Sequence, residues 1–316
     1  MKLRYALLAI LLSAGTAIAA TSPLQMLNAG QVDDAIRVLT DQIKTSPNDA
    51  TAHNLLCRVY FMIDDWDNGI SACERAAQLD SQKSVYFAWL GRIYGEKADH
   101  SSFFTAAGLA KKVRIAFERA VQLDPMSWEA RADLGEYYAE APGIVGGGKD
   151  KARQQADALM SFKPAMAHWL LARIDEKDKD RTAAERDYRA AITASHGNAR
   201  AWFDLGNFFF HAHRFDEMAE AFRHLESTND DFPESLMHAA QVLQRANYDN
   251  ALAIRLLRKY LASPVELGPA FKAHDLLGQL LEKQGDRSGA VEQYRIALSL
   301  WRGDTRAKEA LVRLAR

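Results

Sequence analysis

The sequence has no excess of charge of either sign. Among its 316 residues, 40 Lys and Arg stand against 41 Asp and Glu, which gives a formal net charge of −1 at pH 7. No block of five like charges forms a tail. Because proteins that bind nucleic acid or anionic membranes usually carry a basic surplus, we expect no nucleic-acid partner and no general attraction to a membrane surface.

Long apolar runs are missing after the first residues. Lys2 and Arg4 precede a short apolar run at residues 5–12, and Ala17-Ile18-Ala19 has the small-x-small pattern of a cleavage site. The run is short for a membrane span, and no run of spanning length follows it. We therefore expect residues 1–19 to be a cleaved signal peptide. The mature protein is then periplasmic or secreted, with no integral membrane segment; the alternative is an uncleaved N-terminal anchor.

Patterns typical of catalytic and metal sites are also missing. The sequence has no His-x-x-x-His, Cys-x-x-Cys or Gly-x-Ser-x-Gly motif. His211 and His213 are two residues apart, which points their rings to different sides of a helix. Acidic pairs such as Asp64-Asp65 fall between apolar segments, where Asp caps helices. We expect no metal, no cofactor and no catalytic residue.

A period of about 34 residues governs the rest of the chain. Its clearest copy is Trp202-x-x-Leu205-Gly206-x-x-Phe209, followed by Met218-x-x-x-Phe222. Similar copies surround Leu90-Gly91, Leu134-Gly135 and Leu277-Gly278, and weaker ones surround Leu56-Cys57, Leu171-Ala172 and Ala239-Ala240. Small residues at the Gly and Ala positions let two antiparallel helices approach closely, while large residues fill the space between pairs. No segment alternates in the manner of a strand.

This pattern resembles the tetratricopeptide-repeat (TPR) family over nearly all of the mature length. The resemblance implies an all-α fold, a right-handed superhelical solenoid of antiparallel helix pairs. About eight units would span residues 20–304, the first of them degenerate, and a capping helix would follow at 305–316. The segments "FFTAAGLAKKVRIAFERAVQLDP" and "EYYAEAPGIVGGGKDKA" also resemble an exported bacterial subtype with an "APGIVGG" loop.

The run at residues 143–149, GIVGGGK, matches a phosphate-binding loop up to its last position, where Asp150 replaces Ser or Thr. A phosphate-binding loop follows a strand, but in the repeat frame residues 140–150 are the turn inside a helical hairpin. Asp150 would also place a negative charge beside the phosphates. We therefore expect a structural loop, built by Pro142, Gly143, Gly146, Gly147 and Gly148.

In the family, the first helix of each unit lines the concave face. Projected onto this sequence, that rule predicts a partner-binding groove made of Asn54, Arg58, Arg92, Asp133, Glu136, Trp169, Arg173, Phe203, Asn207, Phe210 and Gln241. Arg58 and Arg92 would form a cationic patch, although the family's clamp for a C-terminal carboxylate is incomplete here.

Three aromatic residues of this predicted groove, Trp169, Phe203 and Phe210, would offer an apolar anchor for a partner. For Trp169, packing between units is an equal alternative. The function expected is a non-enzymatic periplasmic adaptor that binds a protein or peptide segment in the concave groove. The alternative is a structural subunit of an envelope, secretion or cofactor-maturation assembly, and an enzyme is a distant third.

The two cysteines fall in one predicted hairpin. Cys57 occupies the small-residue position of its first helix and Cys73 the aromatic position of its second, at about equal distances from the turn. Close helices can bring Cα atoms within the ~4.4–6.8 Å that a disulfide needs, and an oxidising compartment would close the bond. The alternative is two free cysteines packed as small apolar core residues.

Overall fold

The structure is a computed structural model, and it describes residues 21–228, 232–263 and 269–316. The predicted signal peptide, residues 1–19, lies outside the described residues. Within them the chain forms 17 α-helices and one 3-10 turn and no strand, which confirms the all-α prediction. No helix in this part of the chain is both long enough and apolar enough to cross a membrane.

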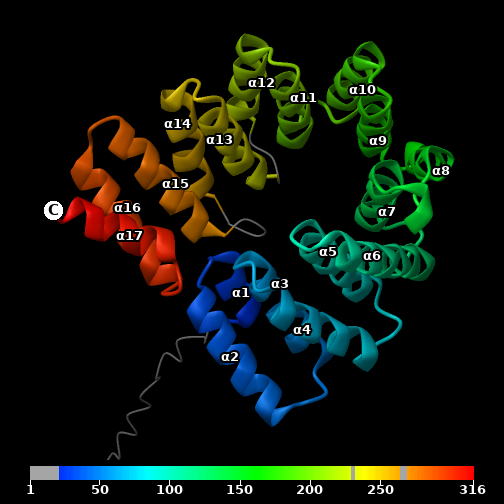
Figure 1. Ribbon diagram of the computed structural model, residues 1–316, viewed down its shortest axis with the longest axis horizontal. Helices are drawn as coiled ribbons and strands as arrows, with labels where there is room; N and C mark the ends of the chain where they lie inside the picture. The colour runs from blue at the N-terminus through cyan, green and yellow to red at the C-terminus, as the bar shows by residue number, and fades with distance from the viewer. Residues whose placement is uncertain (1–20, 229–231, 264–268) are drawn as a thin grey trace, which may run out of the picture.

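The elements follow one another in a regular alternation. In chain order they are α1 (Pro23–Asn28), α2 (Val32–Thr45), α3 (Ala50–Met62), α4 (Trp66–Leu79), α5 (Ser84–Asp99), α6 (Phe103–Leu123), α7 (Trp128–Glu140), η1 (Gly143–Val145), α8 (Lys149–Met160), α9 (Pro164–Lys177), α10 (Arg181–Ala194), α11 (Ala199–His211), α12 (Phe215–Ser227), α13 (Glu234–Ala246), α14 (Asn250–Leu261), α15 (Ala270–Lys283), α16 (Arg287–Leu300) and α17 (Thr305–Leu314). From α3 to α16 each odd-numbered helix packs against the even-numbered helix that follows it. From α1 to α16 the odd-numbered helices face the centre of the molecule and the even-numbered ones lie outside (Figure 1).

Aspartate begins many of these helices. The Asp65 carboxylate accepts from the backbone N–H of Asn68, and Asp286 does the same for Gly289 at 2.9 Å. These bonds satisfy backbone donors that have no partner inside the helix. The acidic pair predicted to lie in a turn is thus a capping device: Asp64 adopts a φ of 62° in the turn, and Asp65 starts α4.

In three hairpins the two helices approach at the predicted glycine, whereas Gly135 of α7 meets Leu170 of α9 in the next unit. A Cβ atom placed on Gly206 would lie 2.3 Å from Cε1 of Phe222, and one on Gly91 would lie 2.4 Å from Cε1 of Phe117. Gly278 meets Tyr294 in the same way, at 2.7 Å. Any side chain at these positions would push the helices apart, so the ring of the second helix determines how close the first can lie.

In the hairpin of α3 and α4 a disulfide takes the place of this contact. Cys57 and Cys73 occupy the same two frame positions, and the structure joins them with their Cα atoms 5.2 Å apart. Both side chains are fully buried. Of the two alternatives that the sequence leaves open, the structure has the bonded one.

The first and last units lie next to each other, so the solenoid closes into a ring (Figure 1). Lys272 of α15 donates to both carboxylate oxygens of Asp64, at 3.0 and 2.9 Å, and Arg302 donates to Asp33 at 3.0 Å. Gly30 meets Ala270 closely enough that a Cβ atom on the glycine would lie 2.8 Å from that of Ala270. We call this junction the seam.

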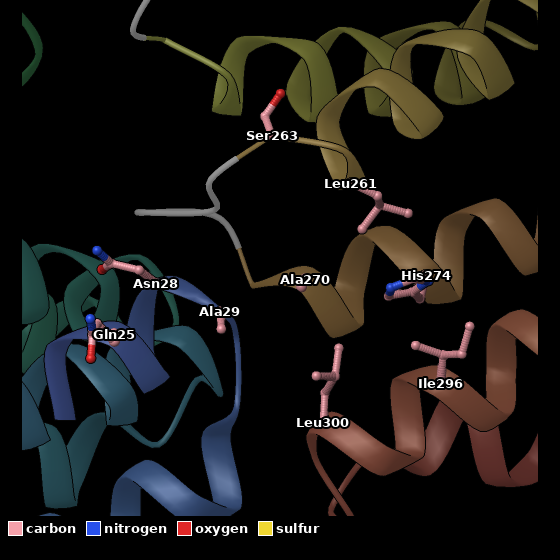
Figure 2. A pocket seen from close by; sticks show the side chains of 9 residues that line it. All are labelled: Gln25, Asn28, Ala29, Leu261, Ser263, Ala270, His274, Ile296 and Leu300. Carbon is pink, nitrogen blue, oxygen red and sulfur yellow. The ribbon is translucent and has the colours of Figure 1, made fainter. Parts of the chain in front are cut away.

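The seam is only partly filled by side chains. It holds a pocket of about 440 Å³, which Figure 2 shows with residues of α1 and its C-cap on one side and residues of the last units on the other. The lining residues are Gln25, Asn28, Ala29, Leu261, Ser263, Ala270, His274, Ile296 and Leu300. The Oδ1 atom of Asn28 is buried without a hydrogen-bond partner in this part of the structure. The ring is therefore held closed mainly by polar contacts, because apolar packing across the seam is sparse.

Removing the disulfide should destabilise the fold. The bond closes a loop with a sequence separation of 16, for which the chain-entropy relation predicts a loss of about 3 kcal/mol in the free energy of unfolding. Urea titration of the Cys57→Ala/Cys73→Ala variant measures the loss, and the native chain unfolded with reductant should shift to match it. Identical midpoints with and without the bond would contradict the expectation.

Reversing the seam charges should open the ring. In Lys272→Glu/Arg302→Glu the two ion pairs become repulsive contacts, so small-angle scattering should show a larger radius of gyration than for the native chain. About 1 M salt, where the screening length falls to ~3 Å, should remove most of the difference between the two chains. Lys283→Glu/Lys308→Glu, on exposed sites of α15 and α17, is the matched control. An unchanged radius would show that the ion pairs do not hold the seam.

Candidate binding surface on the inner face

Ion pairs connect neighbouring units along the inner face of the ring. The Nε atom of Arg92, on α5, lies 2.8 Å from Oδ2 of Asp133 on α7. Glu136 and Glu140, one and two turns further along α7, flank Arg173 of α9 at 3.4 and 2.9 Å. Each pair joins two odd-numbered helices, so the charges form a row that follows the face.

The carboxylates in this row are only partly hydrated. Desolvation raises the pKa of Asp133 and Glu136 above the usual range, and the facing Arg92 and Arg173 offset it only in part. Glu136 keeps 42% of its side chain accessible, but the surrounding helices displace bulk water on most sides. The concave wall therefore makes it costly to ionise these carboxylates, although their side chains remain partly accessible to solvent.

The same effect is stronger on α11 and α13. Desolvation raises the pKa of Asp204 to about 6, although the Arg200 guanidinium lies 3.7 Å away. On α13, desolvation, together with the positive charges of Arg200 and Arg245, lowers the pKa of His238 to about 4. The imidazole is therefore neutral at physiological pH and can both donate and accept a hydrogen bond.

Two tryptophans make cation–π contacts with arginines of the inner face. The guanidinium carbons of Arg58 and Arg92 lie 5.2 and 5.0 Å from the ring centre of Trp89. Arg200 lies 5.3 Å from the ring centre of Trp169. Such cation–π contacts contribute about 0.5–1 kcal/mol each at exposed sites, and they fix the direction in which each guanidinium points.

The glycine loop lies between α7 and α8, as the repeat frame predicts. Gly146 has a φ of 99°, and a Cβ atom on Gly147 would lie 1.8 Å from the carbonyl oxygen of Ala141. The Tyr137 hydroxyl donates to the carbonyl of Val145 at 2.8 Å. A helix enters the loop where a phosphate-binding loop has a strand, and Lys149 forms an ion pair with Asp178. Pro142 and Gly143 begin the 3-10 turn.

The comparisons with known proteins agree with this architecture. A tetratricopeptide-repeat family model matches residues 27–84 and 170–232. Among solved structures, yeast Tom70 superposes with a TM-score of 0.55 over 90% of this chain and 58% of that chain, at 16% identity. These findings support a TPR protein. At this level of identity the likeness to Tom70 concerns the fold.

Two curated relatives are similar in sequence to this chain. Superkiller complex protein 3 of Mus musculus is 23% identical over 304 residues, which covers 81% of this chain and 18% of the relative. The Homo sapiens protein of the same name is 25% identical over 293 residues, which covers 86% of this chain and 17% of the relative. The chain therefore spans less than a fifth of the length of these relatives.

The structure brings together some of the predicted groove residues of the TPR frame. Arg58 and Arg92 meet over Trp89 and form the expected cationic patch, but Asp133 neutralises Arg92. Asn54 is only 5% exposed and contributes to packing within the wall. Glu136 and Arg173 form an ion pair that the sequence projection placed on one face without pairing them.

The three predicted aromatic anchors have different surroundings. Trp169 is 6% exposed, which favours the packing alternative for this residue. Phe203 stacks on Phe222 with ring centres 6.2 Å apart and approaches His238 at 5.7 Å. Phe210 contacts Phe215 near the end of α11. The two amides of the prediction, on α11 and α13, are partly exposed: Asn207 and Gln241.

The projection missed three residues at one frame position. Trp89, Asp204 and His238 each stand directly before the framework Leu or Ala of their unit, where Asp133 also stands. If the prediction had included this position, directly before the framework residue, in every unit, it would have found all three. Arg200 and Glu140 lie about one turn outside the frame, and only the three-dimensional contacts identify them.

The inner-face carboxylate of Asp204 should reduce stability at neutral pH. A carboxyl group whose pKa rises on folding, here from 3.8 to about 6, destabilises the fold above that pH and has little effect below its unfolded value. Asp204→Asn should therefore raise the unfolding free energy at pH 7.5 by about 1–2 kcal/mol, less than the full shift because an amide reproduces the packing of the neutral acid only approximately. Near pH 4 the gain should vanish.

Urea titrations at the two pH values measure this gain. Asp157→Asn, on the exposed side of α8, is the matched control and should change little at either pH. A loss of stability at pH 7.5 in Asp204→Asn would show that its contact with Arg200 outweighs the desolvation.

Proposed function

We propose that this TPR protein is a non-enzymatic adaptor of the bacterial periplasm, which binds an extended segment of a protein partner along its inner face. The observation that carries the proposal is the row of partly dehydrated charges on the odd-numbered helices, from Arg92–Asp133 to Arg200–Asp204. The fold has already removed much of the water from these groups. A partner that offers complementary groups therefore gains contacts at a reduced desolvation cost.

The order of groups along the face describes the segment that fits it. An extended chain would pass the cations over Trp89, then the acidic side chains of α7, and then Arg200 above Trp169. Beyond them it would reach Phe203 and neutral His238. The preferred segment has charges of both signs and an aromatic or apolar residue toward the α11–α13 end.

Two observations support an exported location. Residues 1–19 have a basic start, a short apolar run and a small-x-small site. The structure also contains the Cys57–Cys73 disulfide, and such bonds persist mainly in oxidising compartments. The resemblance of the "APGIVGG" loop to an exported bacterial subtype agrees with both.

A structural subunit of an envelope, secretion or cofactor-maturation assembly is the second candidate. It is favoured by large apolar side chains exposed away from the row of charges, among them Phe104 at 86%. The curated relatives are named as a protein of a complex, which fits a role in assembly as well as in peptide capture.

The experiment identifies the partner at the inner face and then tests the charges. A photo-crosslinking amino acid at Gln241 in the exported protein should trap the partner in cells, and mass spectrometry of the adduct should locate the bound segment. Binding of that segment, measured by calorimetry, should weaken at least tenfold in Arg58→Gln/Arg92→Gln, while circular dichroism stays unchanged. Lys308→Gln, on an exposed site of α17, is the control.

The outcomes separate the two candidates. Binding that survives the double substitution unchanged would contradict recognition by the cationic patch. A partner trapped from the outer surface but never from Gln241 would favour the assembly subunit.

A further inference from the structure

Two departures from the TPR frame lie side by side in the structure. Gly91 and Phe117 are 26 residues apart, against 16 for Gly206 and Phe222. Relative to α11 and α12, the ten extra residues extend α5 by three residues beyond this contact and α6 by seven, or about 4.5 and 10 Å. In the next unit the turn between α7 and α8 is the long glycine loop. Gly146 of that loop packs against Arg114 of α6, where an added Cβ would lie 2.7 Å from the arginine Cδ.

A groove separates the extended end of α5 and α6 from this loop. Its volume is about 360 Å³, and its lining is mostly apolar. Small residues form much of its wall, namely Gly95, Ala98, Ala106, Ala107 and Ala110. We call it the overhang groove. A wall of small side chains lets the backbone of a packed helix approach closely.

Large apolar side chains stand at the mouth of the overhang groove. Phe103 is 80% exposed and Ile144 is 89% exposed, and both belong to the lining. The ring of Phe104 lies 5.7 Å from that of Phe103 and extends the same surface. Burying one such side chain contributes a free energy of about 1.5–3 kcal/mol. These side chains are not buried by the fold itself, so a bound partner could gain this free energy.

The position of Ile144 is built into the loop. Val145, the next residue, is buried, and its carbonyl accepts the hydrogen bond from Tyr137. Gly147 packs against the carbonyl of Ala141 so closely that no other residue fits. The loop therefore holds Ile144 outward on a constrained backbone.

Among the described residues, the one charge in the lining of the overhang groove that has no ion-pair partner is negative. Within the described part of the chain, the charged residues of its lining are Asp99 and Glu140. Glu140 pairs with Arg173 and Lys177, while Asp99 is exposed and forms no ion pair with a described residue. An acidic edge attracts Lys and Arg of a partner and repels anionic lipid headgroups. The charge thus favours a basic protein segment over a membrane surface.

We propose that the overhang groove binds an amphipathic α-helix of a partner protein, separately from the inner face. The apolar side of that helix packs between Phe103 and Ile144, and its Lys or Arg residues lie beside Asp99. The wall of α6 from Phe103 to Val113 is about 15 Å long, enough for roughly three turns of a docked helix. Helix-in-groove recognition of this kind uses apolar residues at helical spacing as anchors.

The test uses two labelled synthetic peptides and the full mature chain. The first peptide is an amphipathic helix with Leu on one side and Lys on the other. The second peptide has the same sequence with Glu in place of every Lys. Fluorescence anisotropy should show saturable binding of the Lys peptide and at least tenfold weaker binding of the Glu peptide. Phe103→Ser and Ile144→Ser should each weaken binding of the Lys peptide at least tenfold, and Asp99→Asn should weaken it and reduce its salt dependence.

Matched controls separate the groove from general stickiness and from the inner face. Ile115→Ser and Met126→Ser remove exposed apolar side chains outside the groove and should leave binding unchanged, as should Arg58→Gln/Arg92→Gln on the inner face. Equal loss in the control variants, equal binding of both peptides, or no binding at millimolar peptide would overturn the proposal. Binding to anionic vesicles through Phe103 and Ile144, without binding of the Lys peptide, would overturn it in favour of a lipid surface.

Discussion

The contact between a small residue on one helix and a large side chain on the next determines the geometry of every hairpin where it occurs. At Gly206 and Phe222 the ring lies directly against the helix backbone, which fixes the separation of α11 and α12. The disulfide between Cys57 and Cys73 fixes the same positions covalently. Because the hairpins share this spacing, the faces of the odd-numbered helices that point away from it line up on the inside of the ring.

This alignment gives the inner face its chemistry. Side chains next to the framework positions face inward from each unit, so charges that are distant in sequence, such as Arg92 and Asp133, become neighbours. The curved wall then removes water from them, as the raised pKa values of Glu136 and Asp204 show. Keeping these carboxylates ionised at neutral pH therefore costs the fold some stability.

The sequence predicts what depends on local spacing. The helix pairs, the turn at the glycine loop and the proximity of Cys57 and Cys73 all follow from residues within one unit, because the repeat frame indicates which residues of two adjacent helices meet. The sequence leaves open whether the two cysteines are bonded. Contacts between units are harder to predict. The pairing of Arg173 with Glu136 and Glu140 depends on the offset between α7 and α9, and the fit of the glycine loop against α6 depends on the extra length of α5 and α6.

The seam is hardest to infer from sequence, since Asp64 and Lys272 are 208 residues apart and small rotations per unit decide whether they meet. Its closure changes how the array can lose structure. In an open stack of repeats, the terminal units have one neighbour instead of two and unravel first. Here α1 and α2 have a second neighbour in the last units. Within the described residues, α1 and α2 can therefore fray only after the seam has opened, so we expect seam opening to precede the loss of these two helices.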